Sequence, residues 1–311
     1  MPRAITHYLF ANDCFNNLDI KTQNIIKKNI NVYNLGSQGS NFFNYYNDLS
    51  FLNKKNTSLL SALIHNKDTN IFFNNMVMYC NSKNNLEHLF NDTNFKNVCI
   101  SYIYGFLSHY ILDEYAHPYI YSLQKTLKEK YKYKSAVALH KSIETHIDKL
   151  ILFKFKSLKP YDFKDYLNID ISNDDLLVIC DMYSYLLSYV YNKKITYDDI
   201  KKSYYTFKKV EKKLNTSYNL FSKIYLNIKN TTVKNSFIDN EIYSNYSHCV
   251  NDLLNENHSV WVDPITLKKH NCSFLDIYNN SLDIFLDTSI KLDSYFKNKS
   301  SIDFLEFKIS Y

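Results

Sequence analysis

The chain has 311 residues, of which 45% are hydrophobic and 22% are charged, so it can bury a full core and is neither a disordered tail nor a mini-protein. It has only 3 glycines and 4 prolines. Sandwiches, barrels and doubly wound α/β folds use both residue types freely, so the composition predicts an all-α fold. The net charge of +6 is spread along the chain rather than gathered in one stripe, which argues against a nucleic acid as partner.

The N-terminus, residues 1–7, lacks the basic stretch and apolar run of a secretory signal, and this predicts a cytoplasmic protein. Apolar residues then recur at helical spacing over residues 59–64 and 176–187. The most apolar stretch, residues 98–112, is too short to cross a bilayer, which takes about 20 residues, and is expected to form a core helix. The six cysteines show no Cys-x-x-Cys pair, so we expect buried thiols and neither a thiolate zinc site nor a disulfide framework.

Loops are expected between these helices where turn-forming residues gather. They fall at residues 34–41, 66–70, 157–160, 192–198 and 262–272. None of these loops is long enough to be an interdomain linker. We therefore expect a single helical domain over residues 1–311, with a metal-site half at about 1–155 and a helical C-terminal half at about 156–311.

Two helical segments carry histidine and carboxylate at a spacing of one turn. His109, Asp113 and His117 follow one another at intervals of four residues, which places their side chains in one stripe, about 5 to 6 Å apart. In the second segment His140 and Glu144 share a face. Asp148 lies one turn further along that face, and His146 points away from it.

The apolar setting of the first stripe favours a metal site over a surface ion pair or ordinary core histidines. A buried carboxylate without a cation or donor is costly, and imidazole with carboxylate suits Zn²⁺. Several such ligands together predict a cluster of ions, and clustered ions favour phosphoester hydrolysis because they generate hydroxide and bridge phosphate oxygens. His88, His248, His258 and His270 are expected to be ordinary core or surface residues.

Five segments together resemble the zinc-dependent phospholipase C family of bacteria, whose all-helical fold is shared with the S1/P1 zinc nucleases. The segments, which fall in the first half of the chain, are Thr6–Tyr8, Leu35–Asn41, Ala62–His65, Gly105–Pro118 and His140–Glu144. Two of the three glycines, Gly36 and Gly39, stand in the second segment, and Gly105 opens the fourth. Two ordinary turns and a tight helix crossing would also explain these glycines.

The resemblance implies a multi-helix bundle with three zinc ions. His7 would bind one ion, His65 and His109 a second, and the third would be held by His117, His140 and Glu144. Asp113 would bridge two ions. A metal-bound hydroxide would attack the phosphorus of a phospholipid or a small phosphodiester, which implies transient contact with a membrane surface; a phospholipid would yield diacylglycerol and a phosphorylated headgroup.

Two departures from the family pattern concern catalysis and the N-terminus. The family has an aspartate, implied to serve as both metal ligand and general base, where this chain has Asn41. An asparagine oxygen can still bind zinc, but it does not accept a proton, and losing a general base typically costs a factor of about 100 to 10,000. Asp48 would replace it if the loop folds back. Secreted members also use a processed N-terminal residue as a ligand, whereas His7 here follows Met1-Pro2.

Three functions therefore compete at the level of sequence. The first is a zinc-dependent phosphodiesterase of the phospholipase C type. The second is a nuclease or nucleotidase of the same fold. The third is a catalytically degenerate helical protein that binds metal, for which Asn41 is the main support.

Overall fold

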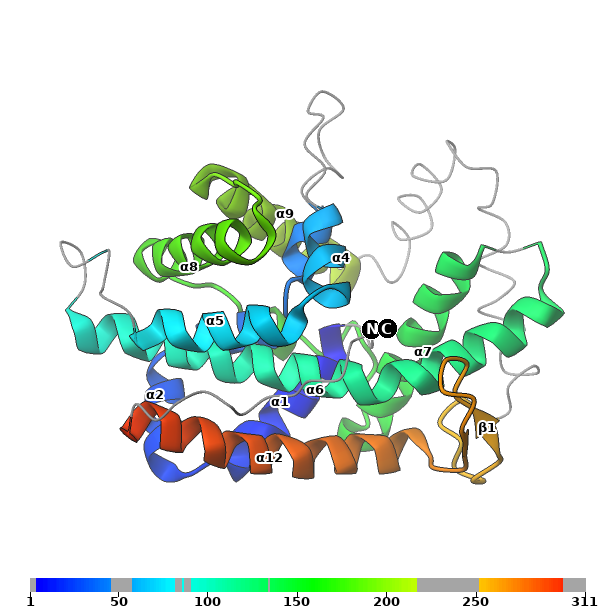
Figure 1. The fold of residues 1–311 in the computed structure, drawn as a ribbon. Helices are drawn as coiled ribbons and strands as arrows, with labels where there is room; N and C mark the ends of the chain where they lie inside the picture. Colours follow the sequence, from blue (N-terminus) through cyan, green and yellow to red (C-terminus); the bar gives the residue numbers. More distant parts are fainter. Residues whose placement is uncertain are drawn as a thin grey trace. The chain divides into compact units, whose positions relative to one another are not determined.

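The computed structural model describes residues 4–45, 58–81, 86, 91–133, 135–216 and 252–298, shown as a ribbon in Figure 1. These residues are mostly helical, and their strands form one two-stranded hairpin, so the prediction of an all-α fold is confirmed. The helices are α1 (Ala4–Asn17), α2 (Ile20–Lys28), α3 (Ile30–Gly36), η1 (Asn41–Tyr45), α4 (Ser58–Asn66), α5 (Thr69–Asn81), α6 (Asp92–Lys130), α7 (Ala136–Lys156), η2 (Asp165–Leu167), α8 (Asn173–Tyr191), α9 (Tyr197–Thr216) and α12 (Phe274–Asn298). The antiparallel hairpin joins β1 (Trp261–Val262) to β2 (Lys269–His270).

The chain divides into two compact units, each assembled from segments that are far apart in sequence. Unit 1 comprises the described parts of Met1–Thr6, Tyr115–Asp165 and Glu211–Asn279. Unit 2 comprises those of His7–Glu114, Tyr166–Val210 and Asn280–Tyr311. The division does not follow the expected halves 1–155 and 156–311, and the single domain over 1–311 stays a prediction.

The N-terminal part of α6 is the central helix of unit 2. Every residue from 101 to 113 is buried, as expected for a helix that is apolar around its whole circumference, so the predicted core helix is confirmed. α5 runs beside it (Figure 1), with the rings of Phe73 and Phe106 stacked at 6.1 Å between centroids. No helix in the described part of the chain is long and apolar enough to cross a membrane.

Polar side chains and left-handed residues define several helix ends. The Ser135 side chain accepts a hydrogen bond from Ala138 N at the start of α7, and that of Ser172 accepts one from Asp175 N at the start of α8. Both serines are therefore N-cap residues. Ser157 ends α7 and Asn192 ends α8 in the left-handed conformation, which confirms the loops expected after both helices.

Four of the five expected loops differ from the structure in their bounds. The loop expected over residues 66–70 is reduced to residues 67–68 between α4 and α5, and the loop expected over residues 192–198 ends at residue 196, before α9. The loop expected over residues 34–41 begins later, because α3 continues to Gly36 and packs there against α6. Within the loop expected over residues 262–272, β1 and β2 form the hairpin. Four of the six cysteines are buried as expected, Cys272 is half-buried, and Cys249 lies outside the described residues.

Asp148 of α7 anchors the first turn of α1 within unit 1. Its carboxylate, 4% exposed, accepts hydrogen bonds from Ile5 N at 3.1 Å, Thr6 N at 3.0 Å and Thr6 Oγ1 at 2.6 Å. The first N–H groups of a helix have no acceptor within the helix. Asp148 therefore caps α1 from another helix, and its negative charge favours that end of the dipole.

Replacing Asp148 with alanine should lower the free energy of unfolding by about 2 kcal/mol, because three donors lose a buried charged acceptor. Urea denaturation followed by circular dichroism measures the change. Asp162→Ala, which removes an exposed carboxylate of the same unit, is the matched control and should change stability by less than about 0.5 kcal/mol. Equal effects of the two substitutions would contradict the capping role.

Candidate metal centre

The three glycines of the chain all stand at one place in unit 2, where α3 and the loop after it meet α6. A Cβ at Gly105 would lie 2.2 Å from the carbonyl oxygen of Tyr33, and one at Gly36 would lie 2.5 Å from that of Tyr102. Only glycine allows the two backbones to approach this closely. The tight helix crossing considered from sequence is therefore present.

Gly39 brings the same loop onto the ring of His109. Its φ is +58°, and a Cβ there would lie 2.2 Å from His109 Cδ2 and 2.4 Å from His109 Nε2. Any larger residue would have to displace the imidazole as well as accept a left-handed backbone. The absence of a side chain at Gly39 thus provides the space that the ring of His109 occupies.

His7, His109 and Asp113 form the first group of candidate ligands. Their exposed fractions are 1%, 0% and 1%, and one ligand atom from each lies within 4.8 Å of the others. Asp113 Oδ1 lies 3.1 Å from His7 Nε2, while its Oδ2 lies 3.2 Å from His109 Nε2. The two oxygens of one carboxylate therefore face two different imidazoles.

Hydrogen bonding and burial leave a lone pair on the nitrogen of His109 that faces Asp113. His109 Nδ1 lies 3.1 Å from the carbonyl oxygen of Ser37, to which it can only donate, so in the neutral ring Nε2 carries the lone pair. Burial, aided by the neighbouring His7, lowers the pKa of His109 well below its usual value. A lone pair would then face a carboxylate oxygen at 3.2 Å, an arrangement that a cation stabilises.

His65 of α4 lies beside this group. Its ring centroid is 5.4 Å from that of His109, and its buried Nε2 has no hydrogen-bond partner among the described residues. Burial lowers the pKa of His65 to about 4, even though Asp113 acts to raise it. An unprotonated, unpartnered imidazole nitrogen here is available to a metal ion.

The second group of candidate ligands, in unit 1, is His117, His140 and Glu144, again with ligand atoms within 4.8 Å of one another. His140 Nε2 lies 2.8 Å from Glu144 Oε1, and its Nδ1 lies 2.8 Å from Gln124 Oε1. The pattern repeats that of His109, with one ring nitrogen donating to a carbonyl oxygen and the other facing a carboxylate. α6 carries His117 directly before Pro118 and continues through that proline.

The structure leaves the role predicted for Asn41 without direct support. Asn41 begins η1, and its Oδ1 accepts a hydrogen bond from Asn44 Nδ2 at 3.4 Å. The adjacent Ser40 lies 3.3 Å, Oγ to Oγ, from Ser61, which places η1 against the helix that carries His65. Asn41 belongs to neither group, and Asp48, its suggested substitute, lies outside the described residues.

The remaining histidines are placed mostly as expected. His146 is half-buried, with Nδ1 2.8 Å from the carbonyl oxygen of Ser142 in its own helix. His270 stacks on Trp261 and His258 bonds to the carbonyl oxygen of Asn271. His88 and His248 lie outside the described residues.

Sequence reasoning missed the two groups that orient the ligand histidines, the Ser37 carbonyl and Gln124. A backbone carbonyl has no signature in sequence. Gln124 does have one, because it follows His117 by seven residues and so extends the stripe on the same face of α6.

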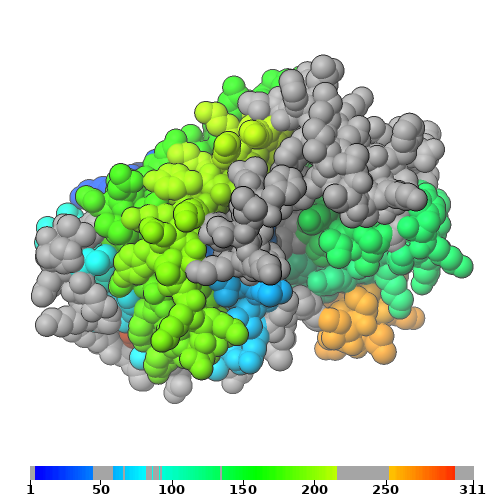
Figure 2. Space-filling view, turned by 90° about the horizontal axis from the view of Figure 1, so that it is seen from above, coloured from blue at the N-terminus to red at the C-terminus, as the bar shows by residue number. Residues whose placement is uncertain are grey.

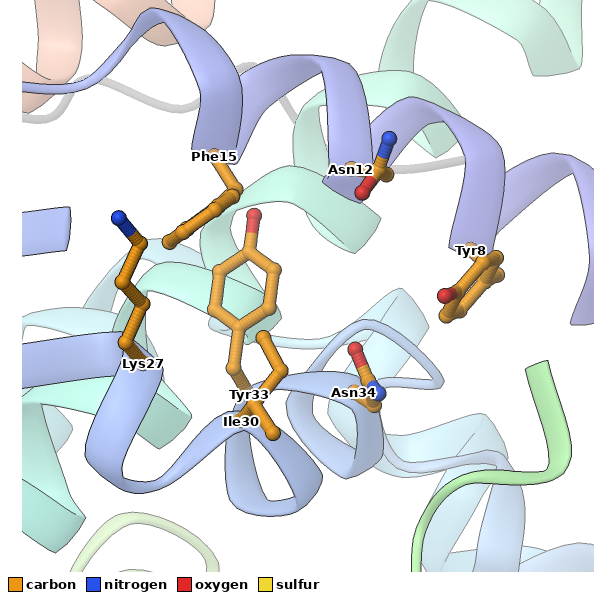
Figure 3. A pocket seen from close by; sticks show the side chains of 7 residues that line it. All are labelled: Tyr8, Asn12, Phe15, Lys27, Ile30, Tyr33 and Asn34. Atoms are coloured by element: carbon orange, nitrogen blue, oxygen red, sulfur yellow. The ribbon is translucent and has the colours of Figure 1, made fainter. Parts of the chain in front are cut away.

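A pocket of about 350 Å³ opens elsewhere in unit 2, between α1, α2 and α3 (Figure 3). Its lining residues are Tyr8, Asn12, Phe15, Lys27, Ile30, Tyr33 and Asn34. None of the candidate ligands lines it. The hydroxyl of Tyr33 already donates to Ala11 O, and the Asn34 amide donates to Asn168 O, so these two polar groups are engaged within the protein.

Comparison with models of known protein families, with curated proteins and with solved structures finds no match to this chain. The candidate metal ligands are therefore distinguished by their own geometry and chemistry. Their shared features are burial, imidazole nitrogens that face carboxylate oxygens, and partners that fix the other ring nitrogen.

Without metal, the protein should lose stability as the pH falls from about 6.5 to about 4. The folded pKa of His65 is about 4, whereas an unfolded histidine titrates near 6.5. Between these values the unfolded chain binds more protons, so the free energy of unfolding decreases as the pH falls. His109 contributes in the same direction.

Urea denaturation of chelator-treated protein at several pH values in this range measures the effect. His65→Gln, which carries no titrating group, should show a shallower fall. A stability profile of the unaltered protein that is flat over this range would contradict neutral burial of these histidines.

Proposed function

We propose that this protein is a metal-dependent phosphodiester hydrolase of the zinc phospholipase C type. The observation that carries the proposal is the repeated ligand pattern, in which the Nδ1–H groups of His109 and His140 each donate a hydrogen bond to a carbonyl oxygen and Nε2 of each ring faces a carboxylate. This orientation of imidazole by an outer hydrogen bond is typical of metal-binding histidines. Surface ion pairs do not require it.

The proposed ligands follow from the two groups. His7, His65, His109 and Asp113 would hold ions in unit 2, and the distribution of the Asp113 oxygens between two imidazoles supports a bridging role. His117, His140 and Glu144 would hold an ion in unit 1. The absence of thiolate and the mixture of imidazole with carboxylate favour Zn²⁺, and the resemblance suggests three ions.

Bound Zn²⁺ would supply Lewis-acid stabilisation of the phosphoryl oxygens and lower the pKa of water. The residues of the chain would hold the ions and orient the imidazole rings that bind them. Ser37 and Gln124 fix the rings of His109 and His140, and Gly39 keeps the space beside His109 clear. The substrate class that this arrangement supports is a phosphodiester, either in a phospholipid or in a small molecule.

Asn41 favours a second candidate function, that of a metal-binding helical protein without catalysis. Its amide does not accept a proton at the position where the family that the chain resembles has its general base. Replacing Asn41 with aspartate should raise hydrolysis by about 100-fold if only the base is lacking.

The first experiment is elemental mass spectrometry of chelator-free protein, combined with assays on phosphatidylcholine, bis(p-nitrophenyl) phosphate and single-stranded DNA. We expect about three zinc ions per chain and release of product from one of the two non-nucleic substrates. Attack on DNA alone would select a nuclease of the same fold. Metal without hydrolysis, in both the unaltered protein and Asn41→Asp, would select the non-catalytic function. No stoichiometric metal after reconstitution would overturn the proposal.

A further inference from the structure

The hairpin of unit 1 exposes apolar side chains at β1, at the residue before it and in the turn between the two strands. Figure 2 shows this part of the chain, in orange, at the surface. Val260 is 67% exposed, Val262 41%, Ile265 59% and Leu267 71%. No other large apolar side chain in the described part of the protein is more exposed than Leu267. Four such residues lie within eight positions of the chain, and exposed apolar side chains gathered in one place are typical of contact surfaces.

The opposite face of the hairpin fixes it firmly to unit 1. Trp261 packs edge-on against Tyr119 at 5.3 Å between ring centroids, and it stacks on His270 at 4.6 Å. The indole Nε1 donates to the carbonyl oxygen of Cys272 at 3.0 Å. Since side chains alternate along a strand, anchoring Trp261 inward turns Val260 and Val262 outward.

The turn is held in a strained shape that presents Leu267. The buried Asp263 accepts hydrogen bonds from Ile265 N at 2.9 Å and from Thr266 Oγ1 at 2.5 Å. Leu267 has a φ of +58°, in the left-handed region that favours glycine or asparagine and is unfavourable for a bulky side chain. An exposed leucine at such a position contributes no packing to offset this strain, which points to an external contact.

The exposed charges within residues 260–270 are both positive. Within residues 260–270, which the structure describes in full, the exposed charged side chains are Lys268 and Lys269, whereas Asp263 is buried. Lys269 pairs with Val262 across the hairpin, so a cation stands directly beside the apolar surface. Apolar tips next to lysines suit the boundary between acyl chains and anionic headgroups.

We propose that the 260–269 hairpin docks this protein on an anionic lipid bilayer, with Ile265 and Leu267 entering the interface and Lys268 and Lys269 facing the headgroups. A narrow turn that projects apolar side chains suits insertion into a fluid surface, whereas a protein partner would have to supply a matching hollow. The inference concerns binding alone. It does not depend on the metal groups or on hydrolysis.

The test is co-sedimentation of the full chain with vesicles of phosphatidylcholine containing about one third phosphatidylserine, with a chelator present so that catalysis does not contribute. The double variant Ile265→Ser/Leu267→Ser should bind at least about 10-fold more weakly, because two apolar side chains no longer enter the interface. Lys268→Gln/Lys269→Gln should bind these vesicles about 10-fold more weakly and lose the preference for them over pure phosphatidylcholine.

Val137→Ser is the matched control, since Val137 is 65% exposed in the same unit but lies on α7. It should bind as the unaltered protein does, and the unfolding midpoints of all variants should agree because the changed side chains are exposed. The proposal is overturned if the unaltered protein does not bind the vesicles, or if the control weakens binding as much as the hairpin variants. It is also overturned if sedimentation equilibrium shows that the hairpin variants lose self-association in solution and leave vesicle binding unchanged.

Discussion

Replacing Asp113 with asparagine should remove metal from unit 2 and lower phosphodiester hydrolysis by about 1,000-fold or more. The change keeps the shape of a side chain that is 1% exposed but removes the charge that faces both His7 and His109. Loss of the cations would forfeit several kcal/mol of transition-state stabilisation. Elemental analysis and steady-state kinetics of the same preparation measure both effects.

The ions are expected to be lost selectively. His117, His140 and Glu144 form their own group in unit 1. About one ion should therefore remain in Asp113→Asn, whereas Glu144→Gln should lose the ion of unit 1 and keep those of unit 2. Glu114→Gln is the matched control, since Glu114 is the adjacent carboxylate on α6 but is not part of either group. An Asp113→Asn protein that keeps its full zinc content would contradict the ligand assignment.

Replacing Gly105 with alanine should lower the free energy of unfolding by about 3 kcal/mol or more. The new Cβ would lie 2.2 Å from Tyr33 O, 2.9 Å from Ser37 N and 3.0 Å from Gly36 Cα, and all three atoms belong to backbone that cannot rotate away. The helices would have to separate, at the cost of the packing around them. Chemical denaturation measures the loss.

The same substitution should also weaken metal binding, because moving the backbone at Ser37 disturbs the carbonyl that orients His109. Ser101→Ala, at another fully buried position of α6, adds no atom and should cost less than about 1 kcal/mol. If Gly105→Ala were as stable as this control, the close approach of α3 and α6 would not be a requirement of the fold.

The sequence could predict the parts of the site that depend on neighbours along one helix. Intervals of four residues place His109 near Asp113 and His140 near Glu144, because helical geometry alone brings such side chains together. No interval relates His7 to Asp113, which is far along the chain, and only the family resemblance suggested that they act together. The hairpin was not predicted either, because two-residue strands are too short to show an alternation of apolar and polar residues.

Contacts made by backbone atoms were beyond prediction from residue types. Any residue at position 37 would offer His109 the same carbonyl oxygen. The hydrogen bonds that Ile5 N and Thr6 N donate to Asp148 likewise come from backbone groups, which no residue type reveals. The helix caps at Ser135 and Ser172 are different, since serine before a helix is a recognisable pattern.

Glycine is favoured either where the backbone is left-handed or where neighbouring atoms leave no room for a Cβ, and this chain distinguishes the two requirements. Left-handed backbone alone does not require glycine here, since Ser157, Asn192, Asn255, His258 and Leu267 all adopt it. Glycine remains at the three places where an added carbon would strike neighbouring atoms. In this chain the closeness of neighbouring atoms, rather than backbone conformation alone, decides where a side chain has no room.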